Sequence, residues 1–296
     1  LVVLDSIEGL KPKTDTSLAL INQGRSSGLR VDTATIDKLL FDNQAAVIAE
    51  DSSGGEERIN LCDYDLILMR KEPPYDMAFH YATQLLSLSG TLVVNSPSAL
   101  RDFNEKLITM PFAQYMPATL VSSNVDQLVG FFDAHNGGIL KKLDSFQGKS
   151  VQRATASDRT LVEDFTGGGV MPVMAQEFLD SVYDGDKRVL MLGSEFLGAS
   201  LRRPREGYHA NFAMSDALAT TLTSREQQIV DELGPWMAER GIHFAGLDFI
   251  GETLTEINIT CPTGIMQVSE LDGRNLAMEM VEYFVALCDE DQKKNV

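Results

Sequence analysis

The chain has 296 residues, of which 43 are acidic and 25 are basic, and its formal net charge is −18. This charge repels nucleic acid and anionic lipid, and the longest apolar runs are far shorter than the roughly 20 residues that cross a bilayer, so neither a nucleic-acid partner nor a membrane is expected. The three cysteines form no paired motif and the first residues lack the features of a signal peptide, which favours a reducing cytoplasm over export.

The first third of the chain predicts alternating strands and helices. Three continuous apolar runs are typical of buried strands, at 1–4, 65–70 and 91–95. Residues 16–27 are expected to form a helix capped by Thr14 or Asp15. Together these elements favour a parallel sheet with both faces covered. The stretch 51–58 is expected to be a surface loop or a hairpin tip, and the missing GxGxxG motif after the first strand argues against a dinucleotide fold.

The segment MRKEPPYD, residues 69–76, follows the second of these strands. In open parallel sheets, ligands bind beyond the carboxyl ends of the strands. The two prolines exclude helix and stiffen the turn that carries Arg70 and Lys71. The segment therefore predicts a ligand site at the strand end, with an ordinary surface loop as the alternative.

From residue 98 onward the sequence predicts helices mixed with antiparallel strands. Helices are expected at 98–110, 124–135, 224–240 and 273–288, and strands at 118–122, in both halves of 137–153, and at 173–179, 243–251 and 254–260. The basic stretch 202–216 is expected to be irregular, and the polar residues after 288 are expected to fray.

Asp248, Glu256 and Asn258 lie within the last pair of apolar strands. Burying such side chains is costly unless a cation meets them, and Mg²⁺ prefers oxygen ligands of this kind. Glu256 and Asn258 share a strand face, and Asp248 joins them only if it sits opposite Glu256. That pairing requires a three-residue loop at 251–253; the alternative is an edge hairpin with solvent-facing polar residues.

Seven motifs occur in one order along the chain: MRKEPPYD, NSPSALRDFNEKL, ILKKLD, AQEFL, DGDKRV, GLDFIG and LTEINIT followed by PT. Together they resemble bacterial glutathione synthetases of the ATP-grasp superfamily, and the resemblance spans nearly the whole chain. It implies a fold of mixed α/β and α+β class, with an N-terminal parallel-sheet substrate domain at 1–101. The small lobe of an ATP-grasp fold would follow at 102–175 and its larger C-terminal lobe at 176–296.

The same resemblance implies a site for ATP and Mg²⁺, for which Mn²⁺ could substitute. Lys106 and Lys141 would hold the phosphates, and Asp186 the ribose. The backbone of four residues would hold the adenine: Gln176, Glu177, Phe178 and Leu179. The metal ligands would be Asp248, Glu256 and Asn258. Arg188 and Arg202 resemble the phosphate and substrate arginines of the family, and with Lys141 they are the expected catalytic residues.

The resemblance also implies the small-molecule substrates. γ-Glutamylcysteine would bind near the end of the strand at 65–70, and the incoming glycine near CPTG at 261–264. The expected substrate residues are Arg70, Lys71, Asp15, Ser17, Pro262 and Thr263. ATP would convert a carboxylate to an acylphosphate, which the amine attacks to give the amide. The family commonly forms dimers or tetramers, so a homo-oligomer is expected.

Two segments depart from the family pattern. The loop after Lys141 has Ser145, Phe146 and Gln147 where glycines are expected, and a later segment has His209 and Ala210 where Arg and Gly are expected. Cys261 replaces a small hydroxyl residue, which we interpret as a packing change. Three hypotheses remain open: a glutathione-forming ligase, a related ligase with a different acid or amine, and a nucleotide-binding homologue with little or no ligase activity.

Overall fold

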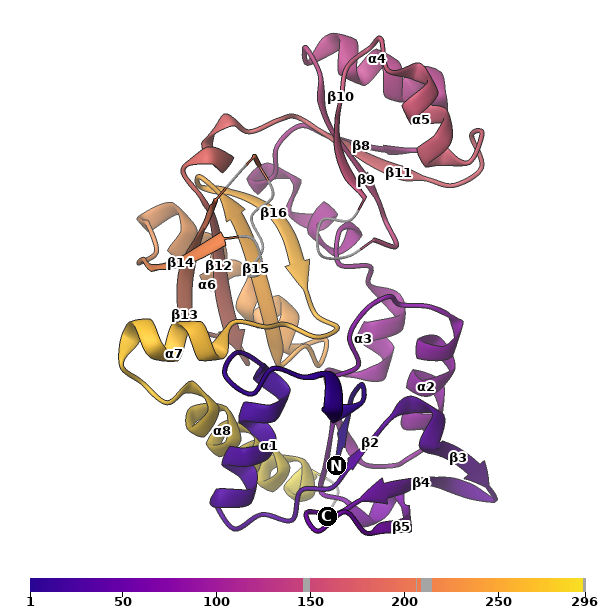
Figure 1. Cartoon of the computed structure of the whole chain (residues 1–296), viewed down its shortest axis with the longest axis vertical. Coiled ribbons are helices and arrows are strands. Elements are labelled where there is room, and N and C mark those ends of the chain that lie inside the picture. The colour runs from indigo at the N-terminus through magenta and orange to yellow at the C-terminus, as the bar shows by residue number, and fades with distance from the viewer. Residues whose placement is uncertain (146–149, 206, 209–214, 295–296) are drawn as a thin grey trace.

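The computed structural model describes residues 1–145, 150–205, 207–208 and 215–294. Their strands form three sheets. Figure 1 shows the N-terminal sheet at the bottom, a small sheet at the top and a third sheet between them. No helix in this part of the chain combines the length and apolarity that a membrane span needs.

The N-terminal sheet has seven strands in the order β3-β4-β2-β1-β6-β7, with β5 beside β4. Their bounds are β1 (Val2–Val3), β2 (Thr33–Ala34), β3 (Leu39–Asp42), β4 (Gln44–Glu50), β5 (Glu56–Asn60), β6 (Leu66–Met69) and β7 (Leu92–Val94). The strands β2, β1, β6 and β7 run parallel, as predicted. β3, β4 and β5 add an antiparallel extension, and the hairpin tip expected at 51–58 is the turn between β4 and β5.

Helices cover both faces of this sheet, as expected. They are α1 (Thr16–Ser26), α2 (Met77–Ser87), α3 (Pro97–Asp102) and the last helix of the chain, α8 (Leu276–Lys294). Val2 belongs to one buried core with Leu20 of α1 and Phe284 of α8, whereas Val3 belongs to another with Phe79 of α2. In Figure 1, α1 and α8 lie side by side on one face. Of the two predicted caps of α1, Asp15 is the one that forms, since its Oδ1 accepts the backbone N–H of Leu18 at 2.8 Å.

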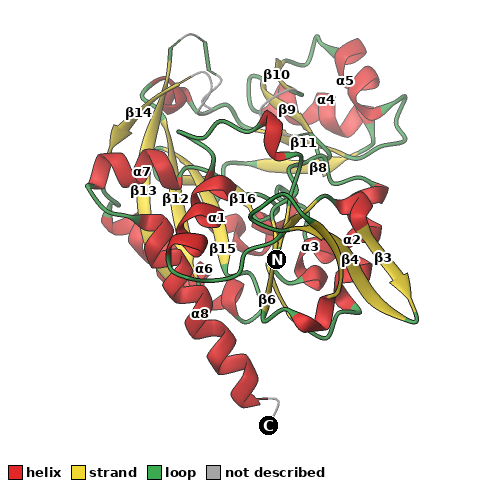
Figure 2. Cartoon of the chain, turned by 60° about the horizontal axis from the view of Figure 1, so that its bottom comes forward, coloured by secondary structure: helices red, strands yellow, loops and turns green. Residues whose placement is uncertain are grey.

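The small sheet is antiparallel, in the order β10-β9-β11-β8, and has its own core. Its elements are β8 (Thr119–Ser122), α4 (Val125–Ala134), β9 (Gly138–Lys142), β10 (Val151–Ala154), α5 (Arg159–Thr166) and β11 (Val173–Gln176). Figure 2 shows α4 and α5 together on one face of the sheet. Two predictions for this region need correction. The strand predicted at 173–179 ends early, at Gln176, and the helix α5 was not predicted.

The third sheet is antiparallel in the order β14-β13-β12-β15-β16. Its elements are β12 (Asp186–Leu192), β13 (Glu195–Pro204), β14 (Ser215–Ala219), α6 (Ser224–Ala238), β15 (Phe244–Ile250), β16 (Thr253–Asn258) and α7 (Ile265–Asp272). Val189 shares a core with Leu233 of α6, and Leu190 shares another with Val268 of α7. Because β12 residues alternate between faces, Asp186 and Arg188 lie on the face that α7 covers only in part.

The helix predicted at 98–110 is wrong, because α3 ends at Asp102 and a 3₁₀ helix, η4 (Leu107–Tyr115), follows. The break lies at Asn104, whose Oδ1 accepts the backbone N–H groups of Lys106 (3.0 Å) and Leu107 (3.3 Å). Such a local side-chain turn competes with the α-helix. The other 3₁₀ helices are η1 (Ile7–Gly9), η2 (Ile36–Lys38), η3 (Leu61–Asp63) and η5 (Asp180–Tyr183).

Two further expectations are wrong. The basic stretch 202–216 is not wholly irregular: β13 runs to Pro204 and β14 begins at Ser215, since ion pairs to Asp186 and Asp248 allow Arg202 to lie inside a sheet. Residues 206 and 209–214 of this stretch lie outside the described part of the chain. The polar tail continues α8 to Lys294, and Gln292 bonds Asp65 beside the first sheet. The domain boundaries at 101 and 175 remain a prediction.

Candidate functional site

The β15–β16 ribbon brings Asp248, Glu256 and Asn258 to one face. Asp248 pairs directly with Glu256 across the ribbon, and Asn258 is two residues further along β16. The pairing that the sequence required is therefore present, but the three-residue loop is not. Ile250 pairs with Thr253 in a tighter turn, and a β-bulge at Thr255 restores the register; the Thr255 hydroxyl donates to the Asp248 carbonyl at 3.0 Å.

Two arginines neutralise Asp248. Arg188 donates through Nε at 2.6 Å to Oδ1 and through Nη2 at 2.9 Å to Oδ2, and Arg202 Nη2 lies 2.9 Å from Oδ1. Burial by itself would raise the pKa of Asp248, but the two guanidinium groups outweigh it and lower the pKa to about 2. Asp248 therefore stays ionised although it is buried.

Asp186 shares Arg202 with Asp248. Arg202 Nη2 lies 2.8 Å from Asp186 Oδ1, and all three side chains project from adjacent strands. Here burial prevails over the arginine and raises the pKa of Asp186 to about 6, with the nearby charge of Asp248 adding to the shift. The pair of carboxylates thus differs in proton affinity because Asp248 has a second arginine and Asp186 does not.

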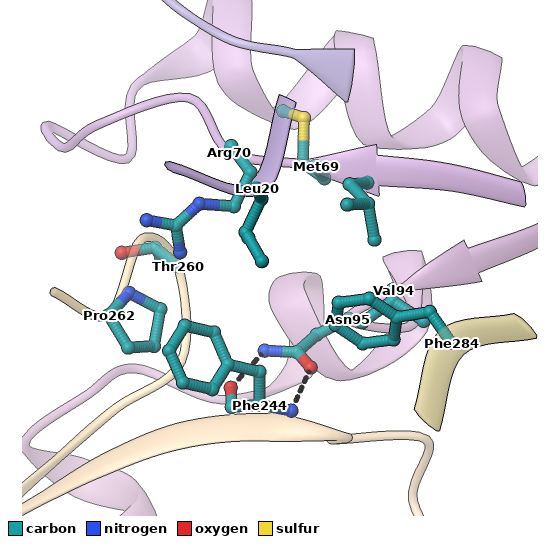
Figure 3. Close-up of a pocket in the computed structure, with 10 residues that line it drawn as sticks. Leu20, Met69, Arg70, Val94, Asn95, Phe244, Thr260, Pro262 and Phe284 are labelled. Atoms are coloured by element: carbon teal, nitrogen blue, oxygen red, sulfur yellow. Dashed lines mark hydrogen bonds between the residues drawn. The ribbon is translucent and has the colours of Figure 1, made fainter. Parts of the chain in front are cut away.

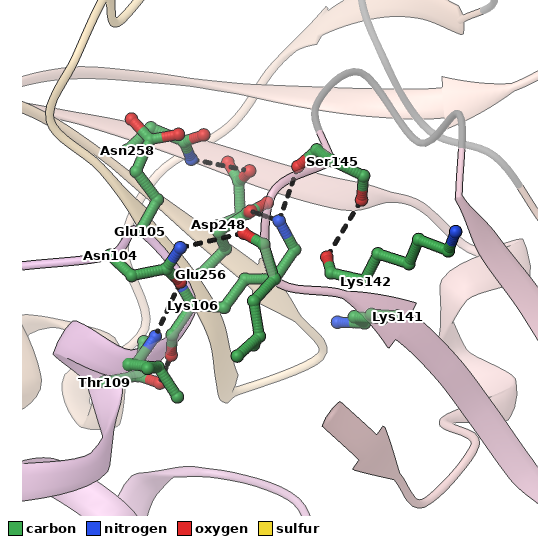
Figure 4. Close-up of polar contacts among 12 residues, drawn as sticks. Asn104, Glu105, Lys106, Thr109, Lys141, Lys142, Ser145, Asp248, Glu256 and Asn258 are labelled. Carbon is green, nitrogen blue, oxygen red and sulfur yellow. Dashed lines mark hydrogen bonds and ion pairs between the residues drawn. The ribbon is translucent and has the colours of Figure 1, made fainter. Parts of the chain in front are cut away.

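Two lysines face the ribbon from other elements (Figure 4). Lys106 Nζ lies 3.3 Å from Glu256 Oε1 and donates to the Ser145 carbonyl at 2.7 Å. Lys141 Nζ, on β9, donates to Gln176 Oε1 at 2.6 Å. Burial lowers the pKa of Lys141, an effect opposed chiefly by Glu256 and also by Asp186 and Asp248. The site is therefore a compact set of opposite charges drawn from five segments of the chain: the start of η4, β9, β12, β13 and the β15–β16 ribbon.

Gln176 is held at the end of β11 by a close backbone approach. Gly138 lies beside it, where a Cβ would come within 2.3 Å of the Gln176 carbonyl oxygen, so only glycine fits. The Gln176 amide donates to Thr119 Oγ1 at 3.1 Å. After β11 the chain leaves the sheet. The guanidinium group of Arg153 stacks over the Phe178 ring, with Cζ 3.9 Å from the ring centroid. Glu177 is exposed, and the Leu179 carbonyl accepts from Val182.

The side-chain oxygens on this face of the ribbon are of the chemical type that binds a magnesium ion. Asp248, Glu256 and Asn258 offer two carboxylates and one amide on one face, which is the hard-oxygen set that Mg²⁺ prefers. Asn258 Nδ2 donates to Asp248 Oδ2 and to the Gly246 carbonyl, both at 3.1 Å, which leaves its Oδ1 to serve as a ligand. Within the described ranges no three His, Cys, Asp or Glu side chains form a metal cluster.

The predicted substrate residues divide between two places. Arg70 is buried at the end of β6; its Nε donates to Ser17 Oγ at 3.1 Å, while Nη1 and Nη2 have no hydrogen-bond partner among the residues that the structure describes. Lys71 pairs with Asp5 at 3.0 Å, and Asp15 serves as the cap of α1. Arg70 borders a cavity of about 10 Å³ together with Asn95, Phe244, Thr260 and Pro262 (Figure 3). Thr263 lies nearer the ribbon, where its carbonyl accepts from Arg188 Nη1 at 3.3 Å.

Three polar residues around this site were not predicted. Asn104 Nδ2 donates to the Leu143 carbonyl at 2.8 Å, and Glu105 accepts three hydrogen bonds from the segment after β16. Asn95, buried at the end of β7, bonds the backbone at the start of β15 and at the end of β16. Polar residues directly after apolar runs, as in VVNS and LRDFNEK, are the signal that points to them. The departures at Phe146, Gln147, His209 and Ala210 lie outside the described residues.

Cys261 is shielded in this site, since its Sγ donates to the Arg70 carbonyl at 3.2 Å and burial raises its pKa to about 12. Only the thiolate is nucleophilic, and at pH 8 a pKa of 12 leaves about one thiol in 10⁴ ionised. Iodoacetamide should therefore modify the exposed Cys62 to completion while Cys261 stays unmodified, as read by peptide mass spectrometry. In urea both should react at similar rates; equal rates in the native protein would contradict this assignment.

The comparisons with known proteins agree with this geometry. The family model described as prokaryotic glutathione synthetase, N-terminal domain, matches residues 1–101, and the model for the ATP-grasp domain of the same family matches 105–273. Glutathione synthetase of Parasynechococcus marenigrum is 38% identical over 298 residues, covering 95% of this chain and 97% of that protein. The Escherichia coli K12 protein is 37% identical over 288 residues, covering 90% and 91%.

Solved structures share the fold at lower identity. The crystal structure of D-cycloserine synthetase DcsG superposes with a TM-score of 0.71 at 15% identity, covering 97% of this chain and 99% of that one. The ATP-grasp ligase PsnB gives 0.67 at 16% identity, covering 96% and 98%. These similarities show the ATP-grasp fold, and the family models together match most of the chain. The chain belongs to the prokaryotic glutathione synthetase family.

Proposed function

We propose that this protein is an ATP-dependent ligase that joins γ-glutamylcysteine and glycine, through an acylphosphate, to make glutathione. Its membership of the glutathione synthetase family supports the proposal. The observation that carries it is the charge arrangement around one ribbon face: Asp248, Glu256 and Asn258 with two arginines and two lysines. Such a set suits a reaction in which negative charge moves between phosphate and carboxylate oxygens.

The chemistry needs charge stabilisation rather than a protein nucleophile. A carboxylate oxygen of the acid attacks the terminal phosphorus of ATP, and ADP leaves. The amine then attacks the acylphosphate carbon, the new C–N bond forms, and phosphate departs with the bonding electrons while the amine loses a proton. Lys106 and Lys141 would hold the phosphate oxygens, and Arg188 and Arg202 would balance the charge that develops during both steps.

The metal proposal follows from the ribbon face. Asp248, Glu256 and Asn258 would hold Mg²⁺, or Mn²⁺ in its place, through their side-chain oxygens. When bound, the ion would neutralise phosphate oxygens of ATP. Arg188 and Arg202 keep Asp248 ionised before any ion binds, and the ion would share the Asp248 oxygens with these two arginines.

The nucleotide base and sugar would lie at the junction of the small and third sheets. The backbone at 176–179 leaves β11 with Gln176 buried and Glu177 exposed, which suits hydrogen bonding to adenine. Asp186, the first residue of β12, would accept from the ribose hydroxyls.

We further propose that the protein works in the cytoplasm, in line with its free cysteines. We also propose that it forms a homo-oligomer.

Arg70 would bind a carboxylate of γ-glutamylcysteine. Within the described part of the chain its two terminal nitrogens are buried without hydrogen-bond partners, which is costly unless an anion meets them. A planar guanidinium fits a carboxylate with two parallel hydrogen bonds. Ser17 and Asp15 at the start of α1, with Lys71, would border the same substrate, and Pro262 and Thr263 would border glycine.

Replacing Arg70 by methionine should raise KM for γ-glutamylcysteine by about 10- to 100-fold, since each lost charge-assisted hydrogen bond is worth about 1.5–3 kcal/mol. The thermal midpoint should stay level or rise, because the unpaired buried donors are gone. Steady-state kinetics and thermal melting check both. Arg58→Met serves as the control, since Arg58 is exposed and pairs with Asp42, which is exposed as well. An unchanged KM in Arg70→Met would reject the carboxylate assignment.

The function itself is tested by phosphate release from ATP. The expected result is release that requires γ-glutamylcysteine, glycine and Mg²⁺ together, with glutathione identified by mass spectrometry. Release only with another acid or amine would replace the proposed substrates. ATP-dependent thermal stabilisation without any release would reject ligase activity.

A further inference from the structure

The segment that follows β16, residues 259–263, is tied to four separate parts of the chain. The Ile259 carbonyl accepts from Asn95 Nδ2 at 2.7 Å, and the Ile259 N–H donates to Glu105 Oε1 at 2.8 Å. Cys261 bonds the carbonyl of Arg70, and Thr263 accepts from Arg188. The segment therefore connects the end of the N-terminal sheet, the η4 region and β12.

Glu105 makes the densest of these contacts. Its Oε1 accepts from Ile259 N–H (2.8 Å), from Thr260 N–H (2.8 Å) and from the Thr260 hydroxyl (2.7 Å). Its own carbonyl accepts from the Ile257 N–H at 3.1 Å. Both the side chain and the backbone of Glu105 thus hold the end of β16 and the two residues beyond it.

Lys106 is the next residue in the chain, and its ammonium group lies 3.3 Å from Glu256. The backbone that carries Lys106 is therefore fixed to the same strand that carries Glu256 and Asn258. Figure 4 shows Glu105, Lys106 and these two residues in one cluster. Glu105 itself makes no contact with Lys141, Arg188 or Asp248 in the hydrogen bonds and ion pairs of the described residues.

Asn95 completes the attachment from the opposite side. Its Nδ2 donates to the Phe244 and Ile259 carbonyls, both at 2.7 Å, and its Oδ1 accepts from the His243 and Phe244 N–H groups at 2.8 and 2.9 Å. The amide uses all of its hydrogen-bonding capacity on β15 and the segment 259–263. Loss of Glu105 therefore frees one side of this segment while Asn95 keeps it attached to the fold.

We propose that Glu105 is a positioning residue, which acts through Lys106 and through residues 260–263 to set the distance between the phosphate site and the amine site. The proposal rests on the proposed function for the roles of those two sites. Glu105 acts as a hydrogen-bond acceptor rather than as a charge, because the hydrogen bonds that it accepts from described residues come from backbone N–H groups and one hydroxyl. Desolvation, reinforced by nearby Glu256, raises the pKa of Glu105, which accords with a structural rather than an electrostatic use.

The test compares Glu105→Ala with Glu105→Gln, in which a carbonyl oxygen can accept the same three hydrogen bonds. Misplacement of supporting groups by about 1 Å costs on the order of 10²-fold in rate. Glu105→Ala should raise KM for glycine about tenfold, lower kcat about tenfold, and weaken Mg·ATP binding about fivefold by calorimetry. Glu105→Gln should stay within about threefold of the parent protein in all three.

Glu226 provides a control for simple destabilisation. It is buried, and its Oε2 accepts from Lys187 (2.6 Å) and the Thr223 N–H (2.7 Å) at the start of α6, away from the ribbon. Glu226→Ala should lower the thermal midpoint without changing KM, kcat or Mg·ATP affinity. If Glu105→Ala behaves like Glu226→Ala, or if Glu105→Gln is impaired as much as Glu105→Ala, the positioning role is rejected.

The calorimetric measurement of Mg·ATP affinity tests the role of Glu105 independently of the proposed function. If the parent protein makes no glutathione, the proposed substrates are rejected, yet Mg·ATP affinity still decides whether Glu105 positions Lys106. If the parent protein is active and only the KM for glycine is unchanged in Glu105→Ala, the coupling to residues 260–263 is rejected.

Discussion

Glu256→Gln is expected to lower turnover by on the order of 10²–10³ and to weaken Mg·ATP binding by at least tenfold. The substitution keeps the shape of the side chain but removes the carboxylate that lies opposite Asp248 and 3.3 Å from Lys106. The remaining lysines and arginines would then face the triphosphate with one ligand missing from the ribbon. Phosphate release measures the first effect, and calorimetry with Mg·ATP measures the second.

The matched control for this prediction is Glu252→Gln. Glu252 lies on the same hairpin, in the exposed turn between β15 and β16, and its loss changes the net charge by the same amount. It should leave turnover and Mg·ATP affinity unchanged. Turnover above half of the parent value in Glu256→Gln would reject the metal assignment.

Arg202→Ala is expected to cost about 3–5 kcal/mol of stability and to reduce turnover by on the order of 10²–10³. Arg202 is buried, and one of its nitrogens bridges Asp186 and Asp248. Without it Asp248 keeps Arg188, but Asp186 becomes a largely buried carboxylate with no other ion-pair partner among the described residues. Thermal melting and phosphate release measure the two losses.

The stability loss should depend on pH. Burial raises the pKa of Asp186 to about 6 even beside Arg202, so the native state holds this proton more tightly than the unfolded state. The contribution of such a group is present at low pH and is lost as pH rises through the native pKa. Removing Arg202 raises that pKa further, so Arg202→Ala should be less destabilised at pH 5 than at pH 8.

A second substitution separates charge burial from catalysis. In the Arg202→Ala background, Asp186→Asn removes the unpaired carboxylate and should restore most of the lost stability at pH 8. Turnover should not recover, since the cation is still absent. Equal destabilisation of Arg202→Ala at both pH values would show that Asp186 is not the source of the penalty.

The period of the last strand was enough to predict that Glu256 and Asn258 share a face, whereas the place of Asp248 depended on the pairing across the hairpin. It could not identify the turn, because a three-residue loop and a two-residue turn with a bulge at Thr255 give the same pairing upstream. Nor could it predict that Arg188 and Arg202 both reach Asp248. These contacts depend on the order of strands in the sheet. There β12 lies between β13 and β15, although β12 and β15 are far apart in the sequence.

The local sequence predicted secondary structure least well where polar side-chain contacts determine it. The stretch 98–110 has helical character, yet the Asn104 side chain ends the helix by taking two backbone N–H groups. The stretch 202–216 has the charge density of a loop, yet Arg202 lies within a sheet because Asp186 on β12 and Asp248 on β15 both pair with it. In both places polar side chains decide the local structure, and hydrophobic periodicity does not report their contacts.

The helix α8 has a consequence for how the chain is made. One face of the first sheet, with Val2, Leu4 and Leu68, is closed by α1 together with Met280 and Phe284 of α8. Because translation runs from the N-terminus, β1 and β6 leave the ribosome long before Met280 and Phe284, and this face of the nascent sheet is exposed to water in the interval. The sheet is therefore not fully covered until α8 is made, and a nascent chain arrested before residue 276 should bind chaperones that the folded protein does not.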